Sequence, residues 1–391
     1  MKLAVFFGGR SAEHDISIVT GLQLIENADK KHSIIPVYIG RNGDWFSGNK
    51  LLDIGFYKNF DENDKDLSRV YISPKPGINA LIVDKEAGFF GPKKPQHINF
   101  DVAILCMHGL NGEDGTLQGL LELANIPYTS SGVLGAAAGM DKVLMKAAFK
   151  GADLPTVESI CVLREDFIDD SAGVVKMLSS SIGYPIIVKP SNLGSSIGIS
   201  KANNDQELTV ALRVASSYDR RILVEKAIVD KIEINCSVLG FSKDVRASVC
   251  EQPNSWEDFL TFEEKYMRNS KNGSAGMKSL SRIIPAQIPD ELAKEIQQLS
   301  VKIFKLFDCK GVVRIDYIYD TKNEELYVNE INTIPGSMSF YLWEPAGISF
   351  STLIEKLIDF ALKAHEQKQV SKYSFSSDVL NKVNLGAKTG K

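Results

Sequence analysis

Apolar segments alternate with polar turns along the 391 residues, and their order predicts the fold. Residues 2–9 (KLAVFFGG) form an apolar run that ends in glycine, residues 16–27 have helical spacing, and residues 32–40 (HSIIPVYIG) form a second apolar run. A strand, a glycine turn, a helix and a second strand in this order predict a parallel, Rossmann-like sheet. Residues 101–109 (DVAILCMHG) predict a further buried strand, and residues 111–127 predict a glycine turn that leads into an amphipathic helix.

The second part of the chain has a different order of elements, with strands that follow one another directly. Residues 184–202 predict a strand, a glycine loop and a strand, and residues 221–240 predict two strands with a short connection. Helices are expected at 139–151, from 290 to about 308 and at about 351–366, and strands at 312–320 and 325–332. We therefore expect an α/β protein in which a Rossmann-like N-terminal domain is followed by α+β subdomains.

Domain boundaries are expected where small or polar residues cluster. The expected units are 1–129, 130–227 and 228–366, followed by a polar tail at 367–391. Residues 41–99 are interpreted as an elaboration of the first domain. Residues 253–283 are rich in Ser, Asn, Gly and charge, and we expect them to form a mobile loop.

Composition excludes several classes of protein. A hydrophobic share of 44% and a charged share of 24% are typical of a soluble globular chain. The net charge of −4, without a dense Lys/Arg block, argues against nucleic-acid binding. No apolar run approaches the roughly 18–20 residues of a membrane span. The five cysteines are scattered and form no CxxC pair, so we expect reduced cysteines in a cytoplasmic protein.

Polar side chains gather on the two strands at 312–320 and 325–332. If these strands form a hairpin centred on Asn323, Asp316 lies opposite Glu330 and Arg314 opposite Asn332. Residues two apart share a face of a strand, so all four side chains would converge. Opposed carboxylates repel unless a cation lies between them, and Asp, Glu and Asn oxygens suit Mg²⁺. On this segment alone, an open hairpin with solvated side chains remains the alternative.

A glycine-rich loop follows the strand that ends at Lys189. In "VKPSNLGSSIG" the glycines permit a tight backbone, and Ser195 and Ser196 add hydroxyl donors. Such a loop is suited to phosphate oxygens, although it is neither a Walker A loop nor a GxGxxG fingerprint. A glycine-rich hairpin turn is the structural alternative.

Residues 222–234 (ILVEKAIVDKIEI) fit an adenosine site. Backbone groups around Glu225 and Ile228 would pair with the adenine edge, and Glu233 would accept hydrogen bonds from ribose hydroxyls. Exposed acidic residues that flank a turn are the structural alternative for this segment.

Together these segments resemble the D-alanine–D-alanine ligases of the ATP-grasp superfamily, over about residues 1–360. The motifs that carry the resemblance are FFGGRSAEHDIS, MHGLNGEDGTLQGLLELANIPYTSSG, MDK, VKPSNLGSSIG, VEK, IEI, FEEKY, GVVRIDY and VNEINTIPG. Their joint occurrence in this order is specific, whereas each motif alone is weak or moderate. The resemblance implies a Rossmann-like substrate domain followed by two ATP-grasp subdomains that clamp ATP.

The family's reaction phosphorylates the carboxylate of one D-alanine with ATP, and the amine of a second D-alanine attacks the acyl phosphate. The resemblance implies that Asp316, Glu330 and Asn332 hold two Mg²⁺ or Mn²⁺ ions. The residues that it assigns to ATP are Lys142, Lys189, Ser195, Glu225, Lys226, Ile228, Glu233 and Lys265. The residues 253–283 are then a lid over the γ-phosphate, because an acyl phosphate must be kept from water.

The resemblance also assigns the substrate side of the site. Glu13 corresponds to the acid that pairs with the first ammonium, and Arg314 to the cation that stabilises the tetrahedral oxyanion. Tyr266 forms a hydrogen-bonded set with Ser195 and Glu13 across the closed site. The residues expected to contact substrate are Glu13, His108, Gly336, Tyr341 and Leu342.

One position departs from the family pattern. Where many members have a serine that receives the acceptor carboxylate, this chain has Tyr341, and Ser337 or Ser339 are alternative sources of a hydroxyl. The predicted function is D-alanine–D-alanine ligation for peptidoglycan synthesis. An ATP-grasp ligase with another acceptor, such as D-lactate or D-serine, and a silent nucleotide-binding regulator are the alternatives. The expected partners are ATP and D-alanine, with no nucleic acid and no membrane; a homodimer is left open.

Overall fold

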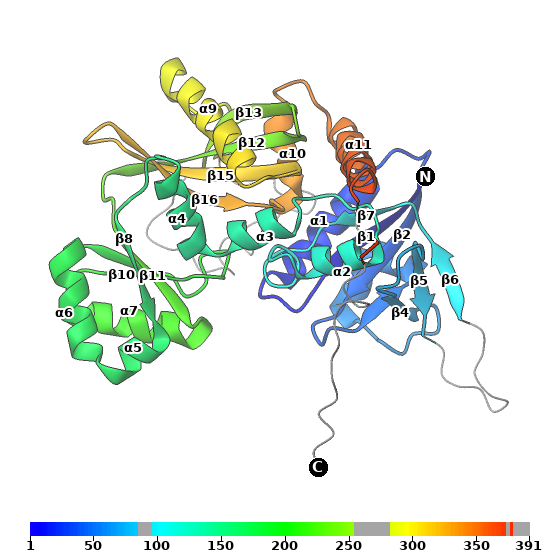
Figure 1. Cartoon of the computed structure of the whole chain (residues 1–391), viewed down its shortest axis with the longest axis horizontal. Coiled ribbons are helices and arrows are strands. Elements are labelled where there is room, and N and C mark those ends of the chain that lie inside the picture. Colours follow the sequence, from blue (N-terminus) through cyan, green and yellow to red (C-terminus); the bar gives the residue numbers. More distant parts are fainter. Residues whose placement is uncertain (85–94, 254–281, 373–375, 378–391) are drawn as a thin grey trace, which may run out of the picture.

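Three sheets and the helices around them form the protein, whose computed structural model describes residues 1–84, 95–253, 282–372 and 376–377. Within these residues the sheets have seven, four and five strands, in chain order. The seven-stranded sheet occupies one side of Figure 1, the four-stranded sheet the other, and the five-stranded sheet lies between and above them. The α/β fold class is therefore confirmed.

The N-terminal sheet begins as a parallel sheet, as the order of its elements predicts. β1 (Lys2–Gly8) lies between β2 (Ser33–Ile39) and β7 (Val102–Leu105) and pairs with both in parallel. Every residue of β1 after Lys2 is buried, which explains its continuous apolar run. Helices α1 (His14–Asn27) and α2 (Thr116–Ala124) belong to this lobe.

Residues 41–99 extend this sheet with antiparallel strands, and the interpretation as an elaboration of the first lobe agrees with the described part of that range. The added elements are β3 (Trp45–Ser47), η1 (Asn49–Leu52), η2 (Ile54–Asn59), β4 (Ser68–Ile72), β5 (Ala80–Val83) and β6 (Gln96–Asn99). The sheet order is β6-β5-β4-β3-β2-β1-β7.

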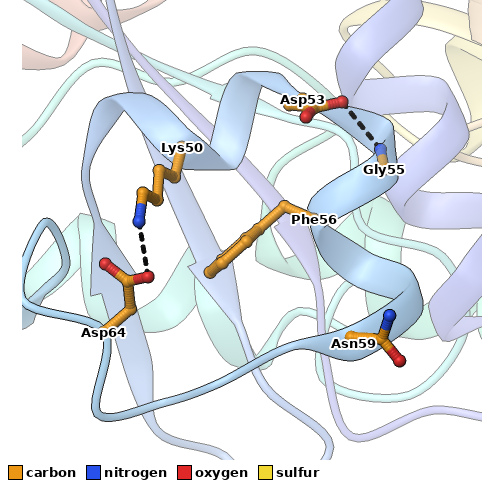
Figure 2. A pocket seen from close by; sticks show the side chains of 6 residues that line it. All are labelled: Lys50, Asp53, Gly55, Phe56, Asn59 and Asp64. Atoms are coloured by element: carbon orange, nitrogen blue, oxygen red, sulfur yellow. Dashed lines mark hydrogen bonds and ion pairs between the residues drawn. The ribbon is translucent and has the colours of Figure 1, made fainter.

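A surface cavity of about 390 Å³ lies beside the two short 3-10 helices of this elaboration (Figure 2). Its lining residues are Lys50, Asp53, Gly55, Phe56, Asn59 and Asp64. Lys50 Nζ bonds Asp64 Oδ2 at 2.6 Å, and Asp53 Oδ1 accepts from the Gly55 amide at 2.8 Å. Its charged groups thus bond protein partners, and none of its lining residues was expected to bind ATP or substrate.

The four-stranded sheet is antiparallel in the order β10-β9-β11-β8 and carries three helices. Its elements are β8 (Ser159–Leu163), α5 (Arg164–Asp169), α6 (Ser171–Ile182), β9 (Ile186–Pro190), β10 (Ser200–Ala202), α7 (Asp205–Tyr218) and β11 (Arg221–Lys226). The buried faces of α6, α7 and the strands form a core of their own.

The five-stranded sheet has the order β14-β13-β12-β15-β16. Its elements are β12 (Lys231–Phe241), β13 (Asp244–Pro253), β14 (Arg282–Ile283), α9 (Asp290–Leu306), β15 (Gly311–Asp320) and β16 (Glu325–Asn332). The two strands predicted within residues 221–240 therefore belong to different sheets, and the chain crosses between the sheets after Lys226.

Two features differ from the sequence-based expectations. The helix expected at 139–151 is two helices, α3 (Val133–Met140) and α4 (Lys142–Gly151), because Asp141 leaves the helical conformation and accepts from the Leu144 amide at 2.8 Å. The last helix was expected to belong to the unit 228–366. In the structure, η4 (Gly336–Ser339) and α10 (Phe340–Trp343) are followed by α11 (Phe350–Gln369), which contributes Leu353 and Leu357 to the core of the N-terminal sheet. In Figure 1, α11 accordingly lies beside α1 and β7. No helix in the described part of the chain combines the length and apolar character needed to cross a membrane.

Candidate active site

The hairpin of β15 and β16 has the register that the sequence predicts at its polar end. Asp316 pairs with Glu330, and Arg314 pairs with Asn332. Towards the turn the register shifts by one residue, so Asn329 is an extra residue on β16. The predicted opposition of the two carboxylates is therefore confirmed, and a β-bulge separates it from the rest of the hairpin.

Asp316 is held by an arginine on its own strand. Arg314 donates from Nε and Nη2 to the two carboxylate oxygens, both at 2.6 Å, and Asn332 Nδ2 donates to Oδ2 at 3.0 Å. Burial nevertheless raises the pKa of Asp316 to about 6, against the opposing effect of Arg314 and with that of Glu330. Because burial disfavours the charged form of Asp316, nearby positive charge is needed to keep this carboxylate ionised.

Glu330 faces a different cation, which comes from α4. Lys142 Nζ lies 3.2 Å from Glu330 Oε2 and donates to the Leu193 carbonyl of the glycine loop at 2.9 Å. Burial raises the pKa of Glu330, but Lys142 and Lys189 outweigh it and hold that pKa at about 2. Lys142 thus contacts both the glycine loop and Glu330 of the five-stranded sheet.

A buried carboxylate on β11 lies between two lysines. Glu225 is 2% exposed, and its two oxygens face Lys189 Nζ at 2.5 Å and Lys146 Nζ at 3.0 Å. Lys189 also donates to Asn329 Oδ1 at 3.2 Å, so the bulge residue on β16 reaches a lysine on β9. Although burial raises the pKa of Glu225, the two lysines hold it at about 2. Two cations against one anion leave positive charge available for phosphate oxygens.

Glu13 and Ser195 come together from opposite lobes, as the family resemblance implies. Ser195 Oγ donates to Glu13 Oε1, and the loop is close enough that a Cβ at Gly194 would lie 2.7 Å from Glu13 Oε2. A side chain at position 194 would therefore displace the Glu13 carboxylate from this position. Burial raises the pKa of Glu13, while the hydrogen bond from Ser195 lowers it. A substrate ammonium placed here would favour the charged carboxylate.

Two further buried groups join the N-terminal lobe to the loop after β16. Glu113 accepts from the Gly109 amide at 2.8 Å and from the Ile334 amide at 3.0 Å, and burial raises its pKa to about 8. His108 is 3% exposed, bonds Thr20 Oγ1 at 2.8 Å, and has its pKa lowered by burial to about 4. His108 is thus neutral at physiological pH.

The loop that begins at Gly336 has an unusual backbone. Ser337, Met338 and Ser339 all have positive φ values of 50°, 53° and 49°. Each such non-glycine residue costs roughly 1–2 kcal/mol, and runs of them concentrate at functional sites. Tyr341 follows on α10 and is 5% exposed, and Leu342 is fully buried.

The residues assigned to adenosine have mixed positions. Lys226 Nζ donates to the carbonyls of Gly183 and Tyr184 at 3.0 and 2.9 Å, so its ammonium is used by a turn of the four-stranded lobe. The Glu233 side chain is 44% exposed and pairs with Lys231 at 2.8 Å, although its charge still acts on Lys189. Ile228 is half-buried between β11 and β12. Lys265 and Tyr266, with residues 254–281 of the expected loop 253–283, lie outside the described residues. The ends of that expected loop are strand residues, because Pro253 ends β13 and Arg282 and Ile283 form β14.

Several polar residues of the site were not singled out from the sequence. Lys146 follows Lys142 by four residues, a spacing that places both on one face of a helix, so helical periodicity was a usable signal. Glu113 lies in the quoted MHGLNGEDG motif. Asn329 carried no local signal, because its partner Lys189 lies on another strand.

The residues present fit a divalent metal ion bound together with phosphates. Two opposed carboxylates and one amide offer hard oxygen ligands, and Mg²⁺ commonly takes one or two carboxylates and completes its shell with water and phosphate oxygens. Lys142 and Lys189 lie across from these carboxylates and Arg314 lies beside them. This arrangement suits phosphoryl transfer, in which positive charge must offset the charge of the moving group.

Comparisons with known proteins cover nearly the whole chain. The sequence pattern of the "D-ala D-ala ligase N-terminus" matches residues 2–131, and that of the "D-ala D-ala ligase C-terminus" matches residues 148–359. The D-alanine--D-alanine ligase of Thermosipho melanesiensis is 37% identical over 389 residues, or 99% of each chain.

Two solved structures have the same fold over most of their length. The D-alanine-D-alanine ligase of Coxiella burnetii has a TM-score of 0.77 and 27% identity, covering 95% of this chain and 96% of that one. The VanG D-Ala:D-Ser ligase of Enterococcus faecalis has a TM-score of 0.76 and 29% identity, covering 92% of this chain and 99% of that one.

Proposed function

Since this chain belongs to the D-alanine–D-alanine ligase family, we propose that it joins two D-alanine molecules at the expense of ATP. ATP transfers its γ-phosphoryl group to the carboxylate of the first D-alanine. The amine of the second D-alanine attacks the acyl phosphate, inorganic phosphate leaves, and a proton is lost from the new amide nitrogen. The products are the dipeptide, ADP and phosphate, and the dipeptide is a precursor of peptidoglycan.

The observation that carries the proposal is the meeting of Glu330 and Lys142 at 3.2 Å, with Asp316 opposite Glu330. It brings the carboxylates of the five-stranded sheet against the lysine that also holds the glycine loop. Asp316, Glu330 and Asn332 would hold two Mg²⁺ or Mn²⁺ ions together with the nucleotide phosphates. Such ions neutralise phosphate charge and orient the transferred group.

The chain's own residues then divide the remaining tasks. Lys142 and Lys189 bind phosphate oxygens, and Glu225 with its second lysine, Lys146, holds Lys189 in place. Arg314 is largely buried and already oriented by Asp316, so it stabilises the oxyanion of the tetrahedral intermediate without reorganising.

Glu13 receives the ammonium of the first D-alanine on the N-terminal side of the cleft. Its hydrogen bond from Ser195 aligns the carboxylate and connects it to the glycine loop. The backbone of Gly336 and the residues after it face the second substrate. The cytoplasm is the proposed location, which the unpaired state of all five cysteines supports.

The proposal is tested by incubating the protein with ATP, Mg²⁺ and a panel of D- and L-amino acids and D-lactate, and identifying the products by mass spectrometry. We expect ADP and D-alanyl-D-alanine in equal amounts. Dipeptide formation without ADP, or ADP formation from no amino acid in the panel, would contradict the proposal.

A second candidate is a ligase with a different acceptor, such as D-serine or D-lactate. Tyr341 at the position of the family's acceptor serine is the reason to test it, whereas the relatives that match nearly the whole chain are named D-alanine--D-alanine ligases and do not favour it. In the same panel, a mixed product that exceeds the D-alanine dimer at equal acceptor concentrations would favour this candidate.

A further inference from the structure

The polar row that contains the two metal-site carboxylates continues across the sheet. Glu251 on β13 pairs with Asn235 on β12, Asn235 pairs with Asp316 on β15, and Asp316 pairs with Glu330 on β16. Directly paired residues present their side chains on the same face of a sheet. Glu251 therefore lies on the same face as the candidate metal site, two strands away from Asp316.

At the far end of this row Glu251 holds an arginine. Arg282, the first residue of β14, places Nη1 at 3.1 Å from Glu251 Oε2, and the other carboxylate oxygen accepts from Asn235 Nδ2 at 2.8 Å. Glu251 is 3% exposed and the Arg282 side chain 10%, so the pair is almost enclosed. Asn235 and Glu251 thus fix the position of the guanidinium.

Tyr341 forms a platform for the same arginine. The guanidinium carbon of Arg282 lies 4.0 Å from the centre of the Tyr341 ring, and the Tyr341 hydroxyl lies 3.5 Å from Glu251 Oε1. A guanidinium stacks on an aromatic ring through its flat face, so its N–H groups remain directed outwards in the plane. The ring therefore supports the guanidinium from one side, and Glu251 fixes the position of its Nη1.

The position of α10 places this group beside the reacting centre. Trp343 Nε1 donates to Ser237 Oγ at 3.0 Å, and Ser237 pairs directly with Arg314 across β12 and β15. The charge of Arg314 acts on the Tyr341 hydroxyl, as do the charges of Glu251 and Arg282. The tyrosine, the arginine and the proposed oxyanion cation are thus neighbours.

The second substrate needs a partner for its carboxylate on this side of the cleft. The serine hydroxyl of many relatives is replaced here by Tyr341, and Ser337 Oγ is already committed to Gln23 Oε1 at 2.6 Å. Arg314 uses two of its nitrogens on Asp316. Arg282, in contrast, bonds one carboxylate of the described chain through Nη1 and hydrogen-bonds the Tyr341 hydroxyl, and a guanidinium has five N–H donors.

We propose that Arg282 binds the carboxylate of the acceptor amino acid, with Tyr341 as its platform and Glu251 and Asn235 as positioning residues. The proposal rests on the ligase function proposed above. It replaces a neutral hydroxyl with a charged partner, and it gives the tyrosine at position 341 a binding role that a serine could not perform. An ion pair with this geometry selects acceptors by their carboxylate and is indifferent to whether an amine or a hydroxyl attacks.

The test is steady-state kinetics of the full-length protein over a wide range of D-alanine concentration, which separates the two D-alanine sites. For Arg282→Gln we expect KM for the second D-alanine to rise about ten- to a hundredfold, as for the loss of a charged hydrogen bond. KM for ATP and for the first D-alanine should change less than about twofold. Arg282→Lys should restore part of the loss. Arg246→Gln, an exposed arginine of β13, is the matched control and should leave all three values unchanged.

Two variants separate the platform from the hydroxyl. Tyr341→Phe keeps the ring beneath the guanidinium and should stay within about threefold of wild type, whereas Tyr341→Ser removes the ring and should raise KM for the acceptor as Arg282→Gln does. Ser339→Ala tests the competing hydroxyl, since Ser339 Oγ is buried and has no hydrogen-bond partner among the described residues.

The proposal is overturned if the acceptor KM of Arg282→Gln stays within about twofold of the wild-type value, or if this variant raises all three KM values equally. It is also overturned if Ser339→Ala raises the acceptor KM and Arg282→Gln does not. These results are distinct from failure of the proposed function. In that case the wild-type protein itself would form no dipeptide from ATP and D-alanine, whatever residue stands at position 282.

Discussion

Asp316 and Glu330 lie directly opposite each other on β15 and β16, and each carboxylate has its own cation. Arg314 holds Asp316 from the same strand, and Lys142 reaches Glu330 from α4. Two anions at opposed positions of a hairpin would otherwise repel each other. The pair therefore requires positive charge, which is supplied here by side chains from two separate parts of the chain and, during the proposed reaction, by metal ions.

Replacing Glu330 by Gln should abolish most activity without affecting the fold. The amide keeps the volume but removes the negative charge that faces the metal ion. Loss of an outer-shell partner of a bound metal costs roughly tenfold to a hundredfold in activity, and kcat of this variant should fall by at least that factor. Product formation is measured while Mg²⁺ is titrated. Glu324→Gln, in the exposed turn of the same hairpin, is the control. Normal turnover of Glu330→Gln at limiting Mg²⁺ would show that Glu330 is not a metal ligand.

Lys146→Met should destabilise the protein and weaken ATP binding. It leaves the buried Glu225 with Lys189 alone and removes the donor that bonds the Val328 carbonyl at 3.1 Å, so we expect a loss of about 1–3 kcal/mol in the free energy of unfolding. KM for ATP should rise, because Lys189 would then be drawn fully into neutralising Glu225. Chemical denaturation and ATP kinetics provide the two measurements.

The matched control for that experiment is Lys150→Met, which changes an exposed lysine of the same helix. Equal stability of wild type and Lys146→Met would contradict the assigned ion pair.

Ser195→Ala should shift the acidic limb of the pH profile to higher pH. The hydroxyl of Ser195 donates to Glu13 and lowers its pKa, which burial otherwise raises. Without that bond Glu13 becomes protonated at a higher pH and no longer pairs with the substrate ammonium, so kcat/KM should also fall roughly tenfold. Measuring kcat/KM against pH for both proteins tests this. Ser217→Ala, on the exposed face of α7, should retain the wild-type profile.

Lys310 predicts a pH dependence of stability that is separate from catalysis. The residue is 6% exposed, and its ammonium donates to the Tyr128 carbonyl at 2.7 Å and lies 4.1 Å from the Tyr128 ring centre. Burial, and then the charge of Lys368, lower its pKa from 10.5 to about 7. Between these two values the unfolded chain binds the extra proton, so this group favours the folded state increasingly as pH rises.

Lys310→Met removes that titration. From about pH 7 to 9 the free energy of unfolding of the wild type should therefore rise relative to Lys310→Met, by at most about 1.4 kcal/mol per pH unit. Denaturant unfolding at several pH values measures the difference. Lys363→Met, which changes an exposed lysine on α11, should follow the wild type. A difference that is constant with pH would mean that Lys310 stays charged in the folded protein.

The hairpin shows how far local pattern could be used for prediction. Two strands with alternating polar residues and a short turn allow few registers, so the opposition of Asp316 and Glu330 was predictable. The turn was predicted to be centred on Asn323, but the strands pair Asp320 with Glu325 next to the turn, so their register there differs from the predicted one. The bulge at Asn329 then restores the predicted pairing at the site. The position of this bulge depends on the neighbouring strand and on Lys189, which bonds Asn329, and it leaves no periodic signal in the sequence.

The sequence by itself determined the buried strands, the parallel start of the N-terminal sheet and the family, because these depend on repeats of two or 3.6 residues and on short motifs within the chain. Only the tertiary structure decided which charges meet: Glu225 with Lys146, and Arg282 with Tyr341. A buried charge is stabilised by whichever opposite group the packing of distant segments brings within about 4 Å, and that distance depends on the whole fold and on no local pattern.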